Sequence, residues 1–424
     1  MFILIKNTFF LLLLPKCIIM VFKMEVTRLP QDKEFRNVYK QIRLLKERGV
    51  FFSNLKYTKC QLMEKSYFNL INGFETLLLD NPKNPPKKYS HTHFQDFLDL
   101  YEFDLKLSSM IFSKISEFET KLKTSIAYYF SKNHCSTLAE NNNYIDINYY
   151  KIPGTTDGPA EYVNNFTKHR LFKVYYFEGR FRGTFNGKVT FNGNKTVLQG
   201  HFIGRFGSTP IREITNGKLT IYNNRQPAIL KQINAITTDS NTTMITELNI
   251  RNVRIYGLNY IDDCKIKFNY INEYKNPPFW VAIKPLMMND LLVLMYGLDK
   301  RTFNEVLRNF NLKPNDREKF LNSIAILKEL RNTCAHFELV NRFRTSSKLP
   351  INAHLIDELK LKTLRSQYVI KLYDTLKILD IYVDVSEIEK LLWEFYDHLS
   401  KTGRIHLATR LYDRMGNFNI YEWI

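Results

Sequence analysis

The segment ELRNTCAHFELVNR, at residues 329–342, contains three side chains whose chemistry suits a phosphate group. Arg331 carries a guanidinium that can grip two phosphate oxygens at once, and His336 carries an imidazole that can accept or donate a proton near neutral pH. Asn332 precedes His336 by four residues, a spacing that places two side chains on one side of a helix. Together the three groups can hold a phosphate and move a proton beside it.

The same residues also fit a structural arrangement. A helix over Asp316–Phe337 has one apolar arc, formed by Phe320, Ile324, Leu327 and Cys334. Arg331 falls near the middle of this arc, where a guanidinium is costly unless it is paired. Arg331 therefore either serves a ligand or pairs with a carboxylate such as Glu119 or Glu338, with His336 as an ordinary packed residue.

Composition indicates a globular chain that is strongly basic. Its 424 residues are 44% hydrophobic and 14% aromatic, enough to bury a large core in two or three structural units. Lys and Arg number 61 against 42 Asp and Glu, a net charge of +19 that points to a polyanionic partner, first of all nucleic acid. A genome whose base composition favours Lys, Asn, Ile and Phe codons gives the same excess without any ligand.

Cysteine and histidine placement predicts a cytoplasmic protein with no metal and no cofactor. The five cysteines are scattered, form no C-x-x-C pair and stand near no histidine at zinc-ligand spacing, which is typical of a reducing compartment. His91 and His93 have no third ligand at a suitable spacing, so we interpret them as loop residues. The sequence contains no Walker loop, G-x-S-x-G elbow or paired-carboxylate motif.

Residues 1–23, MFILIKNTFFLLLLPKCIIMVFK, form an apolar leader. Pro15 and Lys16 interrupt it, so it lacks the roughly 20 continuous apolar residues that a membrane-spanning helix needs. No small-residue cleavage site precedes Met24. We interpret the leader as a gene-model extension before a start at Met24 and expect no stable membrane insertion; a membrane anchor and a signal peptide are the alternatives.

Apolar spacing predicts a helical body interrupted by a β-rich insertion, mainly α with an antiparallel β-meander and α+β overall. Residues 24–149 form its first part, with helices over Gln31–Phe52, Cys60–Leu78 and Phe94–Lys132. Prolines in the loop at 81–93 separate the last two, and we expect a break near Leu107–Ser109. Helices resume over residues 266–345 and 346–424, at Leu286–Tyr296, Thr302–Asn309, Asp316–Phe337, Ile356–Ile381 and Ser386–His398.

The insertion, residues 150–265, alternates polar and apolar residues around Asn-Gly and Gly-Asn steps that suit hairpin turns. Phenylalanines and tyrosines are interleaved there with the basic residues Lys173, Arg180, Arg182 and Lys188. These form either a stacking and phosphate-binding surface or a solvated basic face whose aromatic side chains pack inside. We favour the second interpretation.

The chain resembles the Abi-like family of bacterial abortive-infection proteins, of AbiD and AbiF type, whose helical body belongs to the HEPN superfamily. The likeness covers roughly Tyr39–Asn133 and Pro278–Arg344. It is carried by the segments QIRLLKERGV, SYFNLINGF, FQDFLDLYEFDLKL, ISEFETKLKTSIAYY, FWVAIKPLMMNDLLVLMYGL and ELRNTCAHFELVNR. The last is the most specific, because the family reads close to L-R-N-x-C-A-H followed by N-R.

The resemblance implies a HEPN-like helical bundle whose R-N-x-x-x-H motif is Arg331, Asn332 and His336. In such ribonucleases the 2′-hydroxyl of RNA attacks the neighbouring phosphate, leaving a 2′,3′-cyclic end without a metal, and two copies of the motif meet in a homodimer. The implied role is phage defence or a toxin-antitoxin pair with an antitoxin RNA or protein. The alternative is an RNA-binding protein that does not cut, held in a ribonucleoprotein with a small regulatory RNA.

Four further residues match the family pattern. Asn341 and Arg342 stand at its trailing N-R, where they orient the motif, bind the RNA backbone or lie in a solvated loop. Glu119 and Lys123 resemble an E-x-x-x-K/R pair: either an ordinary ion pair, which we favour, or a carboxylate that holds the motif arginine, with Lys123 also a candidate for substrate binding. Ser108 departs from the pattern, since many members have Arg there, and the β insertion is larger than the pattern leads us to expect.

Overall fold

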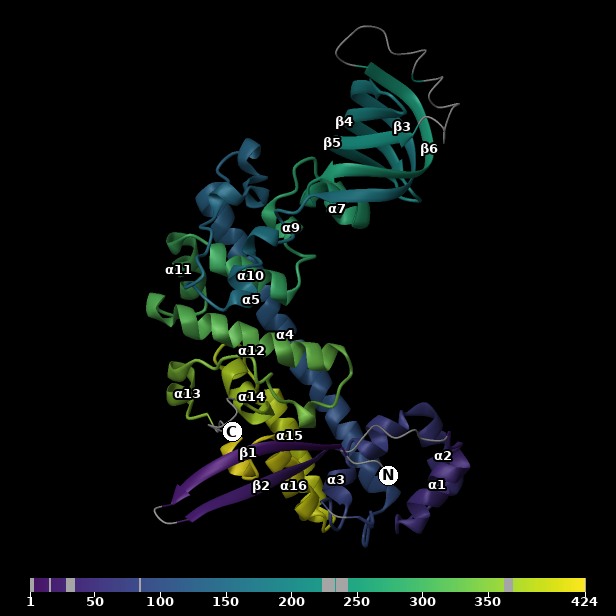
Figure 1. The fold of residues 1–424 in the computed structure, drawn as a ribbon, viewed down its shortest axis with the longest axis vertical. Coiled ribbons are helices and arrows are strands. Elements are labelled where there is room, and N and C mark those ends of the chain that lie inside the picture. Colours follow the sequence, from purple (N-terminus) through teal and green to yellow (C-terminus); the bar gives the residue numbers. More distant parts are fainter. Residues whose placement is uncertain are drawn as a thin grey trace. The chain divides into compact units, whose positions relative to one another are not determined.

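The computed structural model describes residues 4–14, 17–27, 35–83, 85–222, 233, 243–361 and 369–423 (Figure 1). The chain divides into two compact units, residues 1–101 and residues 102–424. None of the helices in the described ranges is both long and apolar enough to cross a membrane. All residues of the R-N-x-x-x-H segment belong to the second unit.

The first unit contains a β-hairpin followed by short helices. Strands β1 (Leu4–Leu14) and β2 (Cys17–Thr27) pair antiparallel. Helix α1 (Val38–Glu47) is followed by Gly49 in the left-handed region at φ +100°, which agrees with the predicted end of this helix. The helix is shorter than predicted, and residues 31–34 of that prediction lie outside the described residues.

The single helix predicted over Cys60–Leu78 is wrong. The chain instead forms three consecutive elements, α2 (Leu55–Glu64), the π-helical turn η1 (Phe68–Asn72) and α3 (Glu75–Leu78). Helix α2 cannot continue because the backbone becomes extended at Lys65, and Gly73 has a low helix propensity. The loop predicted at 81–93 is confirmed, since its described residues form no helix and no named strand.

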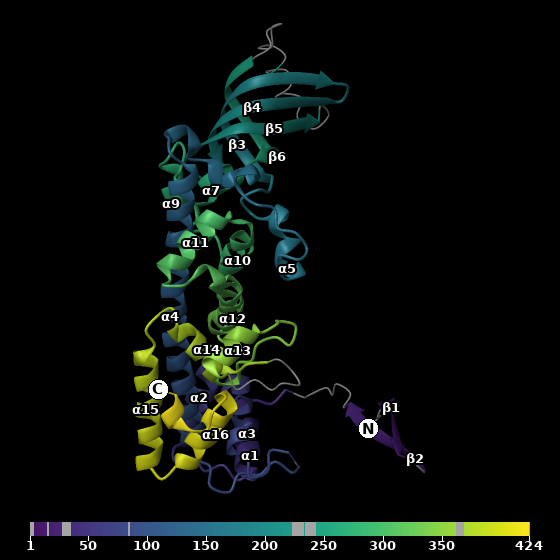
Figure 2. The ribbon, with the colours of Figure 1, turned by 90° about the vertical axis from the view of Figure 1, so that its left-hand side faces the viewer.

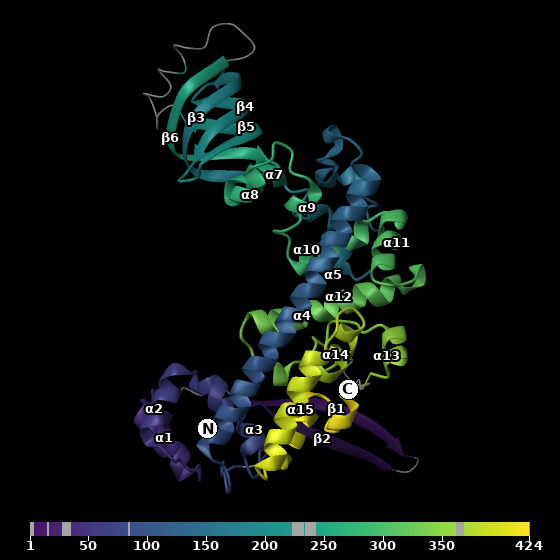
Figure 3. The same cartoon turned by 180° about the vertical axis from the view of Figure 1, so that it is seen from behind.

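Helix α4 (Phe94–His134) is unbroken over 41 residues, so the break predicted near Leu107–Ser109 is wrong. Its buried stripe continues through that region at helical spacing, with Leu107, Ile111, Ile115, Phe118, Leu122 and Ile126 all at 0% exposure. A continuous apolar face favours a continuous helix, and one serine does not interrupt it. Helix α15 lies alongside α4, and α12 crosses α4, in the side view and in the view from behind (Figure 2, Figure 3).

The remaining helices of the second unit are mostly short. They are η2 (Leu138–Glu140), η3 (Asn143–Ile145), η4 (Ile147–Tyr149), α5 (Ala160–Val163), η5 (Phe166–Lys168), α7 (Tyr260–Lys267), α8 (Asn269–Asn272), α9 (Phe279–Ala282), α10 (Met288–Gly297), α11 (Lys300–Asn309), η6 (Pro314–Asp316), α12 (Arg317–Ala335), η7 (Val340–Arg342), α13 (Ala353–Leu359), α14 (Leu372–Asp380), α15 (Ser386–Lys401), α16 (Ile405–Met415) and η8 (Ile420–Glu422). The helix predicted over Ile356–Ile381 is wrong, because α13 ends where Lys360 adopts the left-handed φ of 49°. Helix α16 was not predicted.

The β-rich part is a four-stranded antiparallel sheet that closes on itself. Strands β3 (Tyr175–Asn192), β4 (Lys195–Phe206), β5 (Ile211–Tyr222) and β6 (Thr243–Leu258) follow one another, and β3 also pairs with β6 (Figure 1). This confirms the antiparallel meander. Strands begin only at Tyr175, since short helical turns occupy the residues before it.

The sheet has an aromatic core of its own. The side chains of Phe181, Phe185, Phe202 and Phe206 are buried inside it. Arg180, Arg182 and Lys188 alternate with the inward residues of β3 and are exposed. The expectation that aromatic side chains pack inside is confirmed for these four phenylalanines, whereas the exposed positions of Arg180, Arg182 and Lys188 fit both interpretations. Phe191 is an exception, because its side chain is 50% exposed.

Phe202→Ala should destabilise the closed sheet by about 3–5 kcal/mol, because it leaves a cavity among buried rings. Phe191→Ala is the matched control and should cost less than about 1 kcal/mol, since its ring is largely solvated. Amide hydrogen exchange across β3–β6, followed by mass spectrometry, measures the local effect. Equal acceleration of exchange in the two variants would contradict this account of the core.

Candidate functional site

The R-N-x-x-x-H segment lies at the carboxyl end of α12. Its side chains Asn332 and His336 are exposed, whereas Cys334 between them is buried. The helix ends at His336 because Phe337 takes a left-handed φ of 56° and the backbone N–H of Glu338 donates to the carbonyl of residue 333 at 3.1 Å. This turn leaves the amide and the imidazole on an accessible helix end.

Arg331 turns toward α4. Its guanidinium carbon lies 5.7 Å from the ring centroid of Phe112, and its Nε lies 3.8 Å from a carboxylate oxygen of Glu119. That Nε is buried and has no hydrogen-bond partner, because 3.8 Å is too long for a hydrogen bond. Phe112 and Glu119 thus hold the Arg331 side chain in place, and N–H donors of its guanidinium are left without a partner among the described residues. The side chain is 30% exposed.

Glu119 contacts both of the residues that the sequence analysis gave as alternative partners, Lys123 and Arg331. One carboxylate oxygen lies 2.8 Å from the Lys123 ammonium, and the other faces Arg331. Lys123 also donates to the backbone carbonyl of Lys284 at 3.1 Å. Lys123 therefore has two acceptors within the protein, which leaves it little capacity for a substrate.

Asn341 is fully buried and bonded to α4. Its backbone N–H and its side-chain amide donate to one oxygen of Asp104 at 2.8 and 2.7 Å, and the backbone N–H of Val340 donates to the other at 3.1 Å. The side-chain oxygen Oδ1 of Asn341 in turn accepts from the guanidinium of Arg414 of α16 at 3.0 Å. This arrangement favours the orienting role for Asn341, whereas Arg342 beside it is exposed.

Burial sets the protonation of these groups. It raises the pKa of Asp104 to about 6, although the hydrogen bonds from Asn341 and Val340 oppose the shift. Burial also lowers the pKa of Arg414 to about 10, with repulsion from Arg342 as a smaller cause. At pH 7 Asp104 is therefore mostly ionised and can accept all three N–H groups.

Ser108, the departure from the family pattern, is buried against the motif helix. Its hydroxyl bonds to the thiol of Cys334, and burial raises the pKa of that thiol to about 11. Cys334 is thus a neutral packing residue at physiological pH. The position at which Ser108 departs from the family pattern therefore lies beside the motif helix.

Helix α4 thus presents Asp104, Ser108, Phe112 and Glu119 to the motif. No hydrogen bond in the described part of the chain joins the side chains of Arg331, Asn332 and His336 to one another. The sequence analysis missed Asp104 and Phe112. Both stand four residues from Ser108, a spacing that places them on the same face of a helix. It also missed Arg414, for which the sequence contains no signal. Within the described residues, no group of three or more His, Cys, Asp or Glu is arranged to hold a metal ion.

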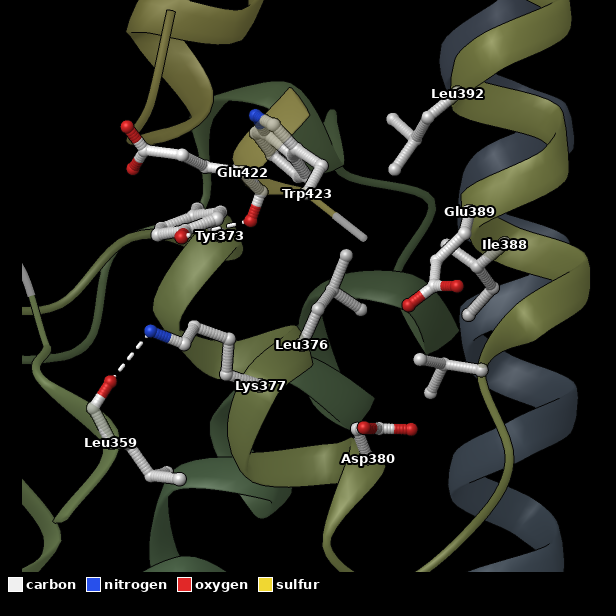
Figure 4. Close-up of a pocket in the computed structure, with 11 residues that line it drawn as sticks. Leu359, Tyr373, Leu376, Lys377, Asp380, Ile388, Glu389, Leu392, Glu422 and Trp423 are labelled. Carbon is white, nitrogen blue, oxygen red and sulfur yellow. Dashed lines mark hydrogen bonds between the residues drawn. The ribbon is translucent and has the colours of Figure 1, made fainter. Parts of the chain in front are cut away.

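A separate pocket lies between α14, α15 and η8 (Figure 4). It holds about 220 Å³, and its walls are mainly apolar, with Leu376, Leu392 and Trp423 among them. Tyr373 closes one side by donating its hydroxyl to the Glu422 carbonyl at 3.0 Å. The pocket shares no residue with the R-N-x-x-x-H segment.

A model of the family described as Abi-like protein matches residues 61–151 and 137–340. The matched ranges contain the α4 residues that face the motif and the whole of Arg331 to His336. No curated protein and no solved structure matches the chain.

Asp104→Asn should change how stability depends on pH. Because the pKa of Asp104 rises from 3.8 to about 6 on folding, the folded state holds the extra proton between these values. This proton binding by Asp104 stabilises the folded state fully below about pH 4, and the stabilisation is lost as the pH rises through 6. From pH 5 to 7 the wild type should lose on the order of 1 kcal/mol that the variant does not lose.

Urea unfolding of both proteins at pH 5, 6 and 7 measures this difference. Asp384→Asn is the control, because hydrogen bonds from Ser386 lower the pKa of exposed Asp384 and move its effect below this range. The Asp384→Asn variant should keep the wild-type dependence of the free energy of unfolding on pH. Parallel curves for wild type and Asp104→Asn would contradict the assignment.

Proposed function

The chain belongs to the Abi-like protein family, which indicates a role in abortive infection, and from this we propose that it acts as a metal-independent endoribonuclease of HEPN type. Arg331, Asn332 and His336 form its active site. Cellular or phage RNA is the substrate, and the cytoplasm is where it acts.

One observation carries the proposal: a guanidinium is held in place with N–H donors to spare, at the same end of α12 as an exposed amide and an exposed imidazole. Phe112 and Glu119 fix Arg331 without hydrogen-bonding its Nε. Asn332 and His336 lie one turn apart on the accessible end of α12. Attack of a neighbouring hydroxyl on a phosphodiester uses such groups, because it needs a proton acceptor and hydrogen-bond donors to the phosphate oxygens.

The chemistry follows from these roles. His336 accepts the proton of the 2′-hydroxyl, whose oxygen forms a bond to phosphorus while the bond to the 5′-oxygen breaks. Arg331 grips the phosphate oxygens as negative charge develops on them, and Asn332 positions the ribose and phosphate. A proton passes to the departing 5′-oxygen, so the products are a 2′,3′-cyclic phosphate and a 5′-hydroxyl.

A second copy of the chain completes the site. Arg331 and His336 are five residues apart, which separates them by about 140° around a helix. Arg331 accordingly faces α4, whereas His336 caps the helix end. In a homodimer whose two motif segments meet, the imidazole of one copy acts as base and that of the other as acid.

His336→Ala should lower RNA cleavage by about 100-fold or more, because it removes the proton-transfer group. The measurement is sequencing of RNA ends after expression, with the 2′,3′-cyclic phosphate as signature. His354→Ala is the matched control, since His354 on α13 is also exposed and lies outside the motif. Wild-type cleavage by the His336 variant would overturn the proposal, and RNA binding without cyclic ends from the wild type would favour the non-cleaving ribonucleoprotein.

The homodimer predicts a mass of about twice 50.4 kDa in light scattering of the active protein. Activity should fall on dilution into the range where the mass falls. A monomer that cleaves at the full rate would contradict the two-copy site.

A further inference from the structure

The outer face of the closed sheet contains a hollow of about 750 Å³ whose lining is mainly polar. Strands β3, β4, β5 and β6 all contribute to it, among others through Arg182 and Gly183 of β3, Gly204 and Arg205 of β4, Ile211 of β5 and Glu247 of β6. We propose that this hollow, called here the arginine groove, binds the sugar-phosphate backbone of single-stranded RNA. The inference rests on the proposed function and names the surface that receives its substrate.

Two arginines lie side by side on neighbouring strands in the lining of the groove. Arg182 and Arg205 are directly opposite in the β3–β4 register, and both are exposed. Like charges at opposite positions of a sheet repel and destabilise it. In the described part of the chain neither guanidinium has an ion pair or a hydrogen bond to a side chain. An anionic ligand would relieve this repulsion and accept two charge-assisted hydrogen bonds.

Two glycines follow the arginines in the register and also line the groove. Gly183 and Gly204 are the next opposite pair in the register. A Cβ on Gly183 would lie 2.1 Å from the Ile203 carbonyl oxygen, and one on Gly204 would lie 2.3 Å from that of Arg182. The close approach of the two strands therefore requires glycine at both positions. Both glycines line the groove beside the two arginines.

Charge complementarity selects an anionic polymer. Strands β3–β6 carry nine Lys and Arg against three Glu, a formal excess of six positive charges. A third guanidinium stands next to the groove, since Arg180 donates to the lining residue Asn249 at 3.1 Å. Among the described residues that line the groove, Glu247 is the one carboxylate. Such a cationic surface tracks a chain of phosphates and does not depend on sequence.

Exposed aliphatic side chains favour a single strand over a duplex. Ile203 is 40% exposed and Ile211 63% exposed, and both line the groove. Unpaired bases offer apolar faces to such side chains, whereas bases stacked in a duplex do not. Threonine and asparagine side chains in the lining supply partners for the 2′-hydroxyl.

The test uses the full chain and a fluorescent 2′-O-methyl oligouridylate of about 16 nucleotides, which cannot be cleaved through its 2′-oxygen. Anisotropy at several salt concentrations gives the affinity of wild type and of the Arg182→Gln, Arg205→Gln double variant. The double variant should bind at least about tenfold more weakly. Its slope of log affinity against log salt should fall by about 1.4, since each phosphate contact contributes about 0.7.

Lys188→Gln with Lys218→Gln is the matched control. These lysines are exposed on the same sheet but outside the groove, and the change in charge is the same. The control should weaken binding less than about threefold. Equal losses in the two double variants, no loss in the arginine variant, or equally tight binding of an RNA duplex would each overturn the inference.

The outcomes separate this inference from the proposed function. Cleavage of unmodified RNA that is lost in His336→Ala, together with normal binding by the arginine variant, contradicts the groove and leaves the ribonuclease standing. Arginine-dependent binding without any cleavage supports the groove and contradicts the ribonuclease.

Discussion

The carboxylate of Asp104 is the interaction on which the placement of the exposed motif depends. It is buried in α4 and accepts three N–H groups from the turn that follows α12, two of them from Asn341. Each of these donors would be costly to leave unpaired in the interior, so the turn has one stable position. Arg414 completes the network from α16, and the end of α12 is thereby fixed from two other helices.

The length of α4 makes this arrangement possible. One helix of 41 residues carries Asp104, Ser108, Phe112 and Glu119, so a single rigid element positions the turn, the packing and the arginine of the motif. The contact between Glu119 and Arg331 is weak, but it is enough to orient the guanidinium. Glu119 is bonded to Lys123 and is only near Arg331, which keeps the guanidinium oriented without satisfying it.

The closed sheet is organised by a different constraint. Four strands can close only when they bend strongly, and paired glycines allow the neighbouring backbones to approach. Its core of phenylalanines is its own, and its cations are exposed because the alternation of β3 sends them outward. The sheet thus combines a stable interior with a cationic surface, independently of the helical motif.

The sequence by itself determined the class of fold, the antiparallel strands and the family, because hydrophobic periodicity and local motifs depend only on residues that are close together in the chain. It also marked Arg331, Asn332 and His336 as a unit. It could not place the break after α13 or predict the continuity of α4, since packing against other elements overrides local propensity. Only the tertiary structure decided that Asn341 is buried on Asp104, that Arg414 joins them and that Glu119 faces both Lys123 and Arg331. These contacts join residues far apart in the chain, where burial and hydrogen-bond satisfaction, and not spacing, select the partner.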